Sequence, residues 1–414
     1  MSPTPLEDQV HDALHRTADP VQRAPFTVTD VRTRARRIQR RRAAVAGAAV
    51  AAVLAVAIPV GAGMVGPSPR SDVPPATEPP APRITGTVRI DPRTAPVGGE
   101  LAVPLINVDD QTLTIGGETI DLPRRYDQLT PYADGWVGIT FVDPQDEGAT
   151  GVEVLGPDFE VRDAVAPSSH LAVSADGSRL AWAEHDGRRW TVVARDRDGA
   201  REERRTPLPP GPQDARVRPV GFLPGDAVLV GTTDPVTGRE SALVVGPDGT
   251  TSPLPDSLVV GSSSEVTGLV SVQTRFTGDG SCWQVRDAGA GGAEVWRTCD
   301  YSLLGFSPDG RYVLGFIDYL TPDGSPTLAV LDAATGERSL DFELVGARTG
   351  VVGINQEVAW EDDDTLVATL VTGDRQYVVR LGLDGTVERV GGDAVDVQPG
   401  DRALMFAAPS VLQR

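Results

Sequence analysis

Lysine is absent from this chain of 414 residues, so all 38 of its basic residues are arginine. Cysteine, methionine and histidine are scarce, with 2, 3 and 4 copies. The motifs Gly-x-Ser-x-Gly, His-Glu-x-x-His and Cys-x-x-Cys are missing, which excludes the hydrolases, zinc proteases and thioredoxin-type proteins that depend on them. We expect no cofactor and no metal ion, and an enzyme is the less favoured class of protein.

The remaining candidates for catalysis or metal binding lack supporting neighbours. His170 and His185 stand in no ligand or triad spacing, so we interpret them as ordinary surface or core histidines. The acidic run 361–364 and the pair Asp196 and Asp198 do not have the spaced ligands of a calcium loop. We interpret these acids as solvated charges in turns.

The formal net charge of -20 is unevenly distributed. Residues 1–42 carry 9 arginines and 5 acidic residues, whereas the chain after residue 65 carries 29 arginines and 53 acidic residues. The acidic part would be repelled by the phosphates of nucleic acid. We therefore expect no nucleic-acid partner.

Residues 43–65 contain no charged side chain over 23 positions, enough for one helix across a bilayer. A cleavable secretory signal is the alternative, but it normally has a shorter lead and a shorter apolar stretch. Arginines cluster just before this segment and predict, by the positive-inside rule, a cytoplasmic N-terminus. The arginines expected to determine the topology are Arg36, Arg37, Arg40, Arg41 and Arg42.

The predicted cytoplasmic tail, residues 1–42, begins with an amphipathic pattern. Leu6, Val10 and Leu14 recur at every fourth position, which is typical of a short helix with one apolar face. A lone helix of this length is marginal in water. A cytoplasmic protein partner is therefore one candidate ligand of the tail.

The chain after the predicted membrane helix divides into a linker and one large domain. Residues 66–85 are rich in proline and predict an extended spacer. Residues 86–414 contain only short β-type runs between Gly, Pro and Asp turns, which predicts an all-β extracytoplasmic domain.

The β-type runs form a repeat of about 40 to 50 residues, within the range of propeller blades. The clearest copies are GFSPDGRYVLGFI (305–317) with TLAVLDAATGER (327–338), LAVSADGSRLAWAEH (171–185) with WTVVARDRDGA (190–200), VGFLPGDAVLVGTT (220–233) with SALVVGPDGTT (241–251), VAWEDDDTLVATLV (358–371) with QYVVRLGLDGT (376–386), and TPYADGWVGITFV (130–142) with GVEVLGPDFEV (151–161). Each copy predicts four antiparallel strands that must stack on neighbouring copies, as the blades of a β-propeller do.

The turn at Ser307–Gly310, the apolar strand after it and the strand ending in Asp-x-x-Thr-Gly at 332–336 resemble the WD40-like or TolB-type propeller repeat. The resemblance implies a fold and no particular activity. The Trp-Asp and Gly-His signatures of true WD40 repeats are absent. The missing lysine and the abundance of Ala, Val, Asp and Pro are typical of GC-rich genomes such as those of actinobacteria.

We predict seven blades, with six or eight as alternatives. Five are the copies above and a sixth covers residues 258–301. The seventh is predicted to combine the last strand, 403–409, with the strands in 101–122, which would close the ring and remove its free edges.

Cys282 and Cys299 flank the predicted hairpin turn at 288–292, so they could face each other on two antiparallel strands. Outside the cytoplasm such a pair predicts a disulfide, and two buried free thiols are the alternative.

The favoured function is a membrane-tethered propeller that binds or senses a protein, a peptide or a cell-wall ligand. One alternative is a transmembrane regulator acting through the N-terminal tail, because the layout resembles that of membrane-bound anti-sigma factors, although their zinc-binding His and Cys motif is missing. Another is a propeller ectoenzyme, a hydrolase or lyase, with carboxylates contributed by different blades.

Overall fold

The computed structural model describes residues 85–141, 150–165, 170–196, 203–210, 215–277, 280–317, 324–345, 352–398 and 403–408. The predicted tail with Leu6, Val10 and Leu14, the predicted membrane helix and the arginines before it lie outside these residues. Within the described part of the chain, no helix has both the length and the apolar character needed to cross a membrane.

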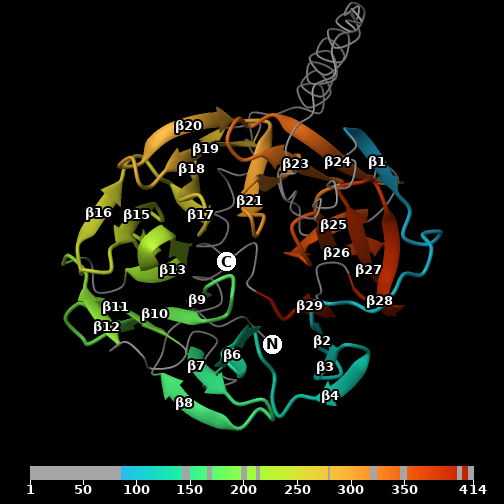
Figure 1. Cartoon of the computed structure of the whole chain (residues 1–414), viewed down its shortest axis with the longest axis horizontal. Coiled ribbons are helices and arrows are strands. Elements are labelled where there is room, and N and C mark those ends of the chain that lie inside the picture. Colours follow the sequence, from blue (N-terminus) through green and yellow to red (C-terminus); the bar gives the residue numbers. More distant parts are fainter. Residues whose placement is uncertain are drawn as a thin grey trace, which may run out of the picture. The chain divides into compact units, whose positions relative to one another are not determined.

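The described residues form seven sheets around a ring, which we call blades 1 to 7, and each contains four antiparallel strands (Figure 1). Blade 1 holds β5 (Gln128–Tyr132), β6 (Gly135–Phe141), β7 (Thr150–Leu155) and β8 (Val161–Val165); blade 2 holds β9 (Leu171–Val173), β10 (Arg179–His185), β11 (Trp190–Asp196) and β12 (Arg204–Pro207); blade 3 holds β13 (Arg216–Leu223), β14 (Ala227–Thr233), β15 (Glu240–Val245) and β16 (Thr251–Leu254), with the short 3-10 turn η2 (Pro224–Asp226). Blade 4 holds β17 (Val259–Ser263), β18 (Leu269–Thr277), β19 (Gly280–Asp287) and β20 (Ala293–Thr298); blade 5 holds β21 (Tyr301–Phe306), β22 (Tyr312–Ile317), β23 (Thr327–Asp332) and β24 (Arg338–Leu344); blade 6 holds β25 (Val352–Trp360), β26 (Thr365–Thr372), β27 (Arg375–Gly382) and β28 (Val387–Asp396).

Blade 7 closes the ring with strands from both ends of the domain. It holds β2 (Leu105–Asn107), β3 (Thr112–Ile115), β4 (Glu118–Asp121) and β29 (Leu404–Phe406), in the order β29-β2-β3-β4. Leu105 pairs with Phe406, and Asn107 pairs with Leu404. The predictions of seven blades and of a mixed closing blade are confirmed.

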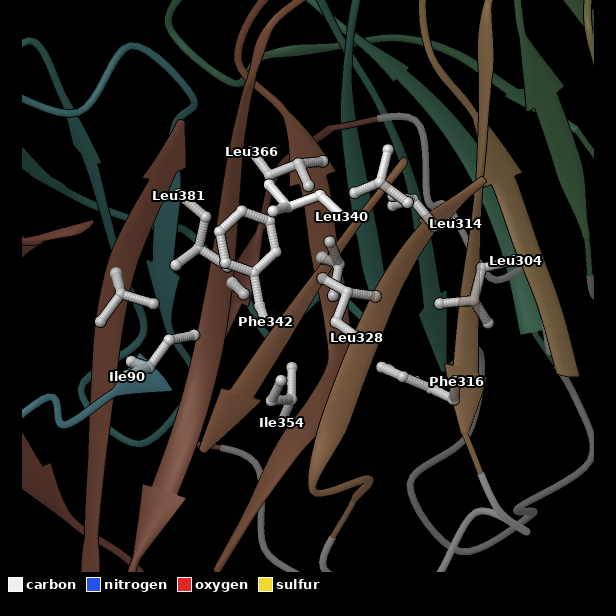
Figure 2. Close-up of a cluster of buried hydrophobic side chains, with 14 of the residues drawn as sticks. Ile90, Leu304, Leu314, Phe316, Leu328, Leu340, Phe342, Ile354, Leu366 and Leu381 are labelled. Carbon is white, nitrogen blue, oxygen red and sulfur yellow. The ribbon is translucent and has the colours of Figure 1, made fainter. Parts of the chain in front are cut away.

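The core lies between the blades rather than inside them. Seven separate clusters of buried apolar side chains fill the seven junctions between neighbouring sheets. The largest joins blades 5 and 6, where Phe342 and Leu328 face Leu366 (Figure 2). A four-stranded blade has two apolar faces, and only stacking on two neighbours removes both from water.

Residues 86–100, which the repeat pattern left unassigned, pass along the rim of two blades. β1 (Gly86–Ile90) adds a fifth strand to blade 5, parallel to β24, with Gly86 paired to Leu340. Ile90 is fully buried in the cluster between blades 5 and 6. Residues 91–103, which we call the strap, then run to blade 7, and Val97 makes a parallel bridge with Arg389 on β28.

One ion pair holds the strap on blade 6. Arg380 Nε lies 2.5 Å from Glu361 Oε2, and Arg380 Nη2 donates to the carbonyl of Glu100 at 2.6 Å. Glu361 Oε1 accepts the N–H of Ala102 at 2.7 Å. The side chain of Glu361 is only 7% exposed, so its interpretation as a solvated turn charge was wrong. The reason is that Arg380 on β27 and the strap cover this side chain.

The structure contains the predicted disulfide between Cys282 on β19 and Cys299, the residue after β20. Trp283 pairs with Thr298, which places the two cysteines opposite each other with Cα atoms 4.1 Å apart. The bond joins the outer edge strand of blade 4 to its neighbour.

Asp341 is a buried carboxylate on β24. Its side chain is 6% exposed and accepts a hydrogen bond from Arg338 Nη1 at 2.8 Å, while Oδ1 has no hydrogen-bond partner in the described part of the chain. Burial raises the pKa of Asp341 above its ordinary 3.8, against the opposing effect of Arg338. The folded chain therefore holds this proton more tightly than the unfolded chain. Stability is lost as the pH rises from the unfolded pKa through the folded pKa.

We expect Asp341→Asn to remove this loss, because asparagine carries no charge to desolvate. The variant should unfold at a higher temperature than the wild type at about pH 7, and the difference should shrink toward about pH 3, where Asp341 is neutral. Thermal unfolding of the two full-length chains at several pH values measures this. The difference between the unfolding temperatures of the two chains at each pH isolates the effect of Asp341. Other carboxyls, such as Asp176, whose pKa is lowered, are present in both chains and cancel. A variant that is less stable at neutral pH would contradict the assignment.

Candidate functional site

The two ends of the ring carry different sets of turns. In an antiparallel blade, the turn between the first and second strands and the turn between the third and fourth strands lie at the same end. We call the first-to-second-strand turns of blades 1 to 6 the turn ring. Their acidic residues are Asp134, Asp176, Asp226, Glu265, Asp309 and the run Glu361 to Asp364.

Two of these turns share the Ser-x-Asp-Gly pattern and one hydrogen-bonding scheme. Asp176 Oδ1 accepts the hydroxyl of Ser174 at 2.6 Å and the N–H of Ser178 at 3.0 Å. The hydroxyl of Ser174 is the largest cause that lowers the pKa of Asp176, to about 2. Gly177 has a φ of 67°, which an L side chain adopts only with strain. The carboxylate therefore fixes the turn.

In blade 5, Ser307 belongs to a turn, as the sequence predicted, and it makes hydrogen bonds like those of Ser174. Its hydroxyl donates to Asp309 Oδ1 at 2.7 Å and accepts the N–H of Tyr312 at 2.9 Å. Although burial acts to raise the pKa of Asp309, hydrogen bonds from Arg311 and Ser307 lower it. Ser307 is 3% exposed, so this serine is part of a turn and is not placed as a nucleophile.

Arg179 connects the turns of three blades. From the start of β10 it pairs with Asp226 of blade 3 at 2.6 Å and with Glu265 of blade 4, and its guanidinium lies 4.8 Å from the ring centroid of Phe222. Glu265 Oε2 also accepts the N–H of Ala175 in blade 2 at 3.1 Å. These turns therefore form one continuous, cross-linked surface.

A second connection joins the turns of blades 5 and 6. Arg311 pairs with Asp309 and lies 3.7 Å from Asp364. Burial and the negative charge of Asp309 raise the pKa of Asp363. In the described part of the chain, no group of three or more His, Cys, Asp or Glu side chains is placed to hold a metal ion.

A pocket of about 270 Å³ lies between blades 1 and 2 at the same end of the ring. Its lining residues come from the β5–β6 turn, the ends of β7 and β11, and β8. They are Tyr132, Ala133, Asp134, Val154, Leu155, Arg162, Arg195 and Asp196. We call this the inter-blade pocket.

His185 has the surroundings of an ordinary histidine, whereas the surroundings of Asp196 were not expected from the sequence. The ring of His185 lies 4.9 Å from that of Trp190, and its Nδ1 accepts the N–H of Gly187 at 3.3 Å. Asp196, interpreted as a solvated charge, lines the inter-blade pocket, and Asp198 lies outside the described residues. The pocket was missed because its residues come from two blades and share no local motif.

No protein-family model and no curated protein matches this sequence. Among solved structures, TolB from Acinetobacter baumannii has a TM-score of 0.38 at 14% identity and covers 75% of this chain and 68% of its own. The β-propeller domain of Cps50 (Swd1) from Myceliophteria thermophila has a TM-score of 0.42 at 11% identity, over 73% of this chain and 88% of its own. A functionally unknown protein from Desulfotomaculum acetoxidans has a TM-score of 0.45 at 11% identity, over 74% and 99%.

Its seven sheets make this chain a seven-bladed β-propeller, and it has distant structural similarity to TolB and to WD40-type propellers. The likeness concerns the fold and carries nothing about activity.

Proposed function

We propose that this chain is a membrane-tethered, extracytoplasmic binding module whose turn ring takes a protein, a peptide or a cell-wall ligand. The uncharged segment 43–65, the arginines before it and the disulfide favour this location. We further propose that a cytoplasmic protein binds the tail, on the pattern of Leu6, Val10 and Leu14.

The observation that carries the binding role is the cross-linking of the turns. Arg179 joins blades 2, 3 and 4, and Arg311 joins blades 5 and 6. A surface whose turns are held in place before a partner arrives loses little conformational entropy on binding. Loops that carry binding residues on a rigid scaffold are the usual arrangement of recognition sites.

Two exposed valines at opposite ends of the ring provide the test. Val266 lies in the turn ring on blade 4 and is 62% exposed, whereas Val236 lies in a β14–β15 turn at the other end and is 89% exposed. In one variant a photoreactive amino acid replaces Val266, and in the other it replaces Val236. Each full-length variant is produced in the native cells. Photochemistry is needed because the chain has no lysine for amine-reactive reagents.

We expect covalent adducts at position 266 and several-fold fewer at position 236, with mass spectrometry identifying the partner. Adducts confined to position 236, or none at either position, would defeat the proposal. A separate assay tests the topology: in intact spheroplasts, added protease can reach the domain if it lies outside the membrane, whereas the membrane shields a domain that lies in the cytoplasm.

A further inference from the structure

The inter-blade pocket has two arginines in its wall, and both are already paired. Arg162 on β8 donates from Nη1 to Asp134 Oδ1 at 2.8 Å and from Nε to Glu160 Oε1 at 3.0 Å. Arg195 on β11 donates from Nη1 to Asp163 Oδ2 at 2.7 Å. Its guanidinium also lies 5.3 Å from the ring centroid of Trp182. The side chains are therefore held in fixed positions by carboxylates and one aromatic ring.

These pairings disfavour a charged ligand. An anion would have to compete with Asp134, Glu160 and Asp163 for the two guanidinium groups, and it would also meet the carboxylate of Asp196. A cation would meet Arg162 and Arg195, which take up part of the wall. Either ion would exchange full hydration for a lining in which the charges of Arg162 and Arg195 are offset by those of Asp134 and Asp196.

A neutral ligand rich in hydroxyl groups matches the same wall. Each hydroxyl can donate one hydrogen bond and accept others. Arg162 uses Nε and Nη1 in its ion pairs, and Nη2 makes no hydrogen bond in the described part of the chain, so it can donate to a hydroxyl. Asp134 is 59% exposed and can accept from one, while Val154 gives the C–H face of a ring an apolar contact. Groups held by other bonds before the ligand arrives lose little freedom on binding.

We propose that the inter-blade pocket binds one ring of a neutral saccharide. The volume of about 270 Å³ is slightly below the range of sites for drug-sized ligands, as expected for a single ring. The pocket shares Asp134 with the turn ring but lies on blades 1 and 2, whereas Val266 lies on blade 4. The saccharide titration and the photo-crosslinking at position 266 can therefore fail independently of each other.

Titration of the purified full-length chain with neutral trisaccharides tests the proposal. Maltotriose and N,N′,N″-triacetylchitotriose serve as probes, with calorimetry for affinity and saturation-transfer NMR for the ring in contact. We expect at least one to bind with a millimolar or lower Kd. Arg162→Met should weaken that binding at least about tenfold, since it removes a hydrogen bond from a charged donor. Arg162 is 41% exposed, so the fold should survive the change.

Arg205→Met is the matched control, because Arg205 is an exposed arginine on β12 of blade 2, pairs with Glu203 at 2.7 Å and does not line the pocket. We expect its binding to equal that of the wild type. No binding of either probe, equal binding by the Arg162 variant, or tighter binding of a trigalacturonate probe would each overturn the proposal.

Discussion

Replacement of Arg380 by alanine is expected to lower the free energy of unfolding by about 3 to 5 kcal/mol, the usual cost of removing one partner of a buried ion pair. The change would leave the carboxylate of Glu361, which is 7% exposed, with the N–H of Ala102 and no cation. It would also remove the hydrogen bond from Nη2 to the carbonyl of Glu100. Urea unfolding of the full-length chain measures the loss, and hydrogen exchange of the strap should become faster.

Two controls separate this effect from a general cost of losing an arginine. Arg297→Ala removes an arginine that is 69% exposed and pairs with Glu294 at 2.7 Å, so we expect a loss below about 1 kcal/mol. The double variant Arg380→Ala/Glu361→Ala removes the stranded carboxylate as well, and it should be more stable than Arg380→Ala alone. Equal losses in the free energy of unfolding for Arg380→Ala and Arg297→Ala would contradict the stabilising role of the contacts between Arg380, Glu361 and the strap.

The strap and β1 were not predicted from the sequence. Blades could be predicted because each one repeats local signals, such as the turn at Ser174–Ser178 and the paired strands after it. β1 carries no such repeat, and its partner β24 lies far along the chain, so no local pattern identifies the pairing. Glu361 has the same difficulty, because its burial depends on Arg380 and on residues 100–102, which come from two separate parts of the sequence.

The candidate sites were predictable to a smaller extent. The acidic turns were visible as residues, but their connection by Arg179 required the positions of blades 2, 3 and 4. The inter-blade pocket depends on Arg162 and Arg195, which stand on different blades and in sequence look like ordinary surface arginines. A propeller brings together residues from neighbouring repeats, and this information is absent from any single repeat.

Removal of the disulfide, by Cys282→Ala with Cys299→Ala, is expected to cost about 3 kcal/mol, the value for a closed loop of length similar to the sequence separation of 17 between the cysteines. The edge strand β20 explains why this bond matters. β20 pairs with β19 on one side only and carries Val295, which is 41% exposed. Without the disulfide, β20 would separate from β19 and leave the edge of β19 open. Urea unfolding of the full-length wild type with and without a reductant should show the same loss, whereas the variant should be insensitive to the reductant.

The redox dependence also bears on where the domain folds. In the reducing cytoplasm both cysteines would stay as thiols and blade 4 would lack its cross-link, whereas outside it the bond persists. Thiol labelling of the chain in intact cells, followed by labelling after reduction, should therefore reveal two cysteines only after reduction if the domain is extracytoplasmic. Labelling of both thiols before reduction would count against the proposed location.

The stability prediction has its own contrary outcome. If the variant without the two cysteines were as stable as the wild type in urea, β20 would be held by its backbone pairing and by Trp296, whose Nε1 donates to the carbonyl of Ala333 in blade 5 at 2.8 Å.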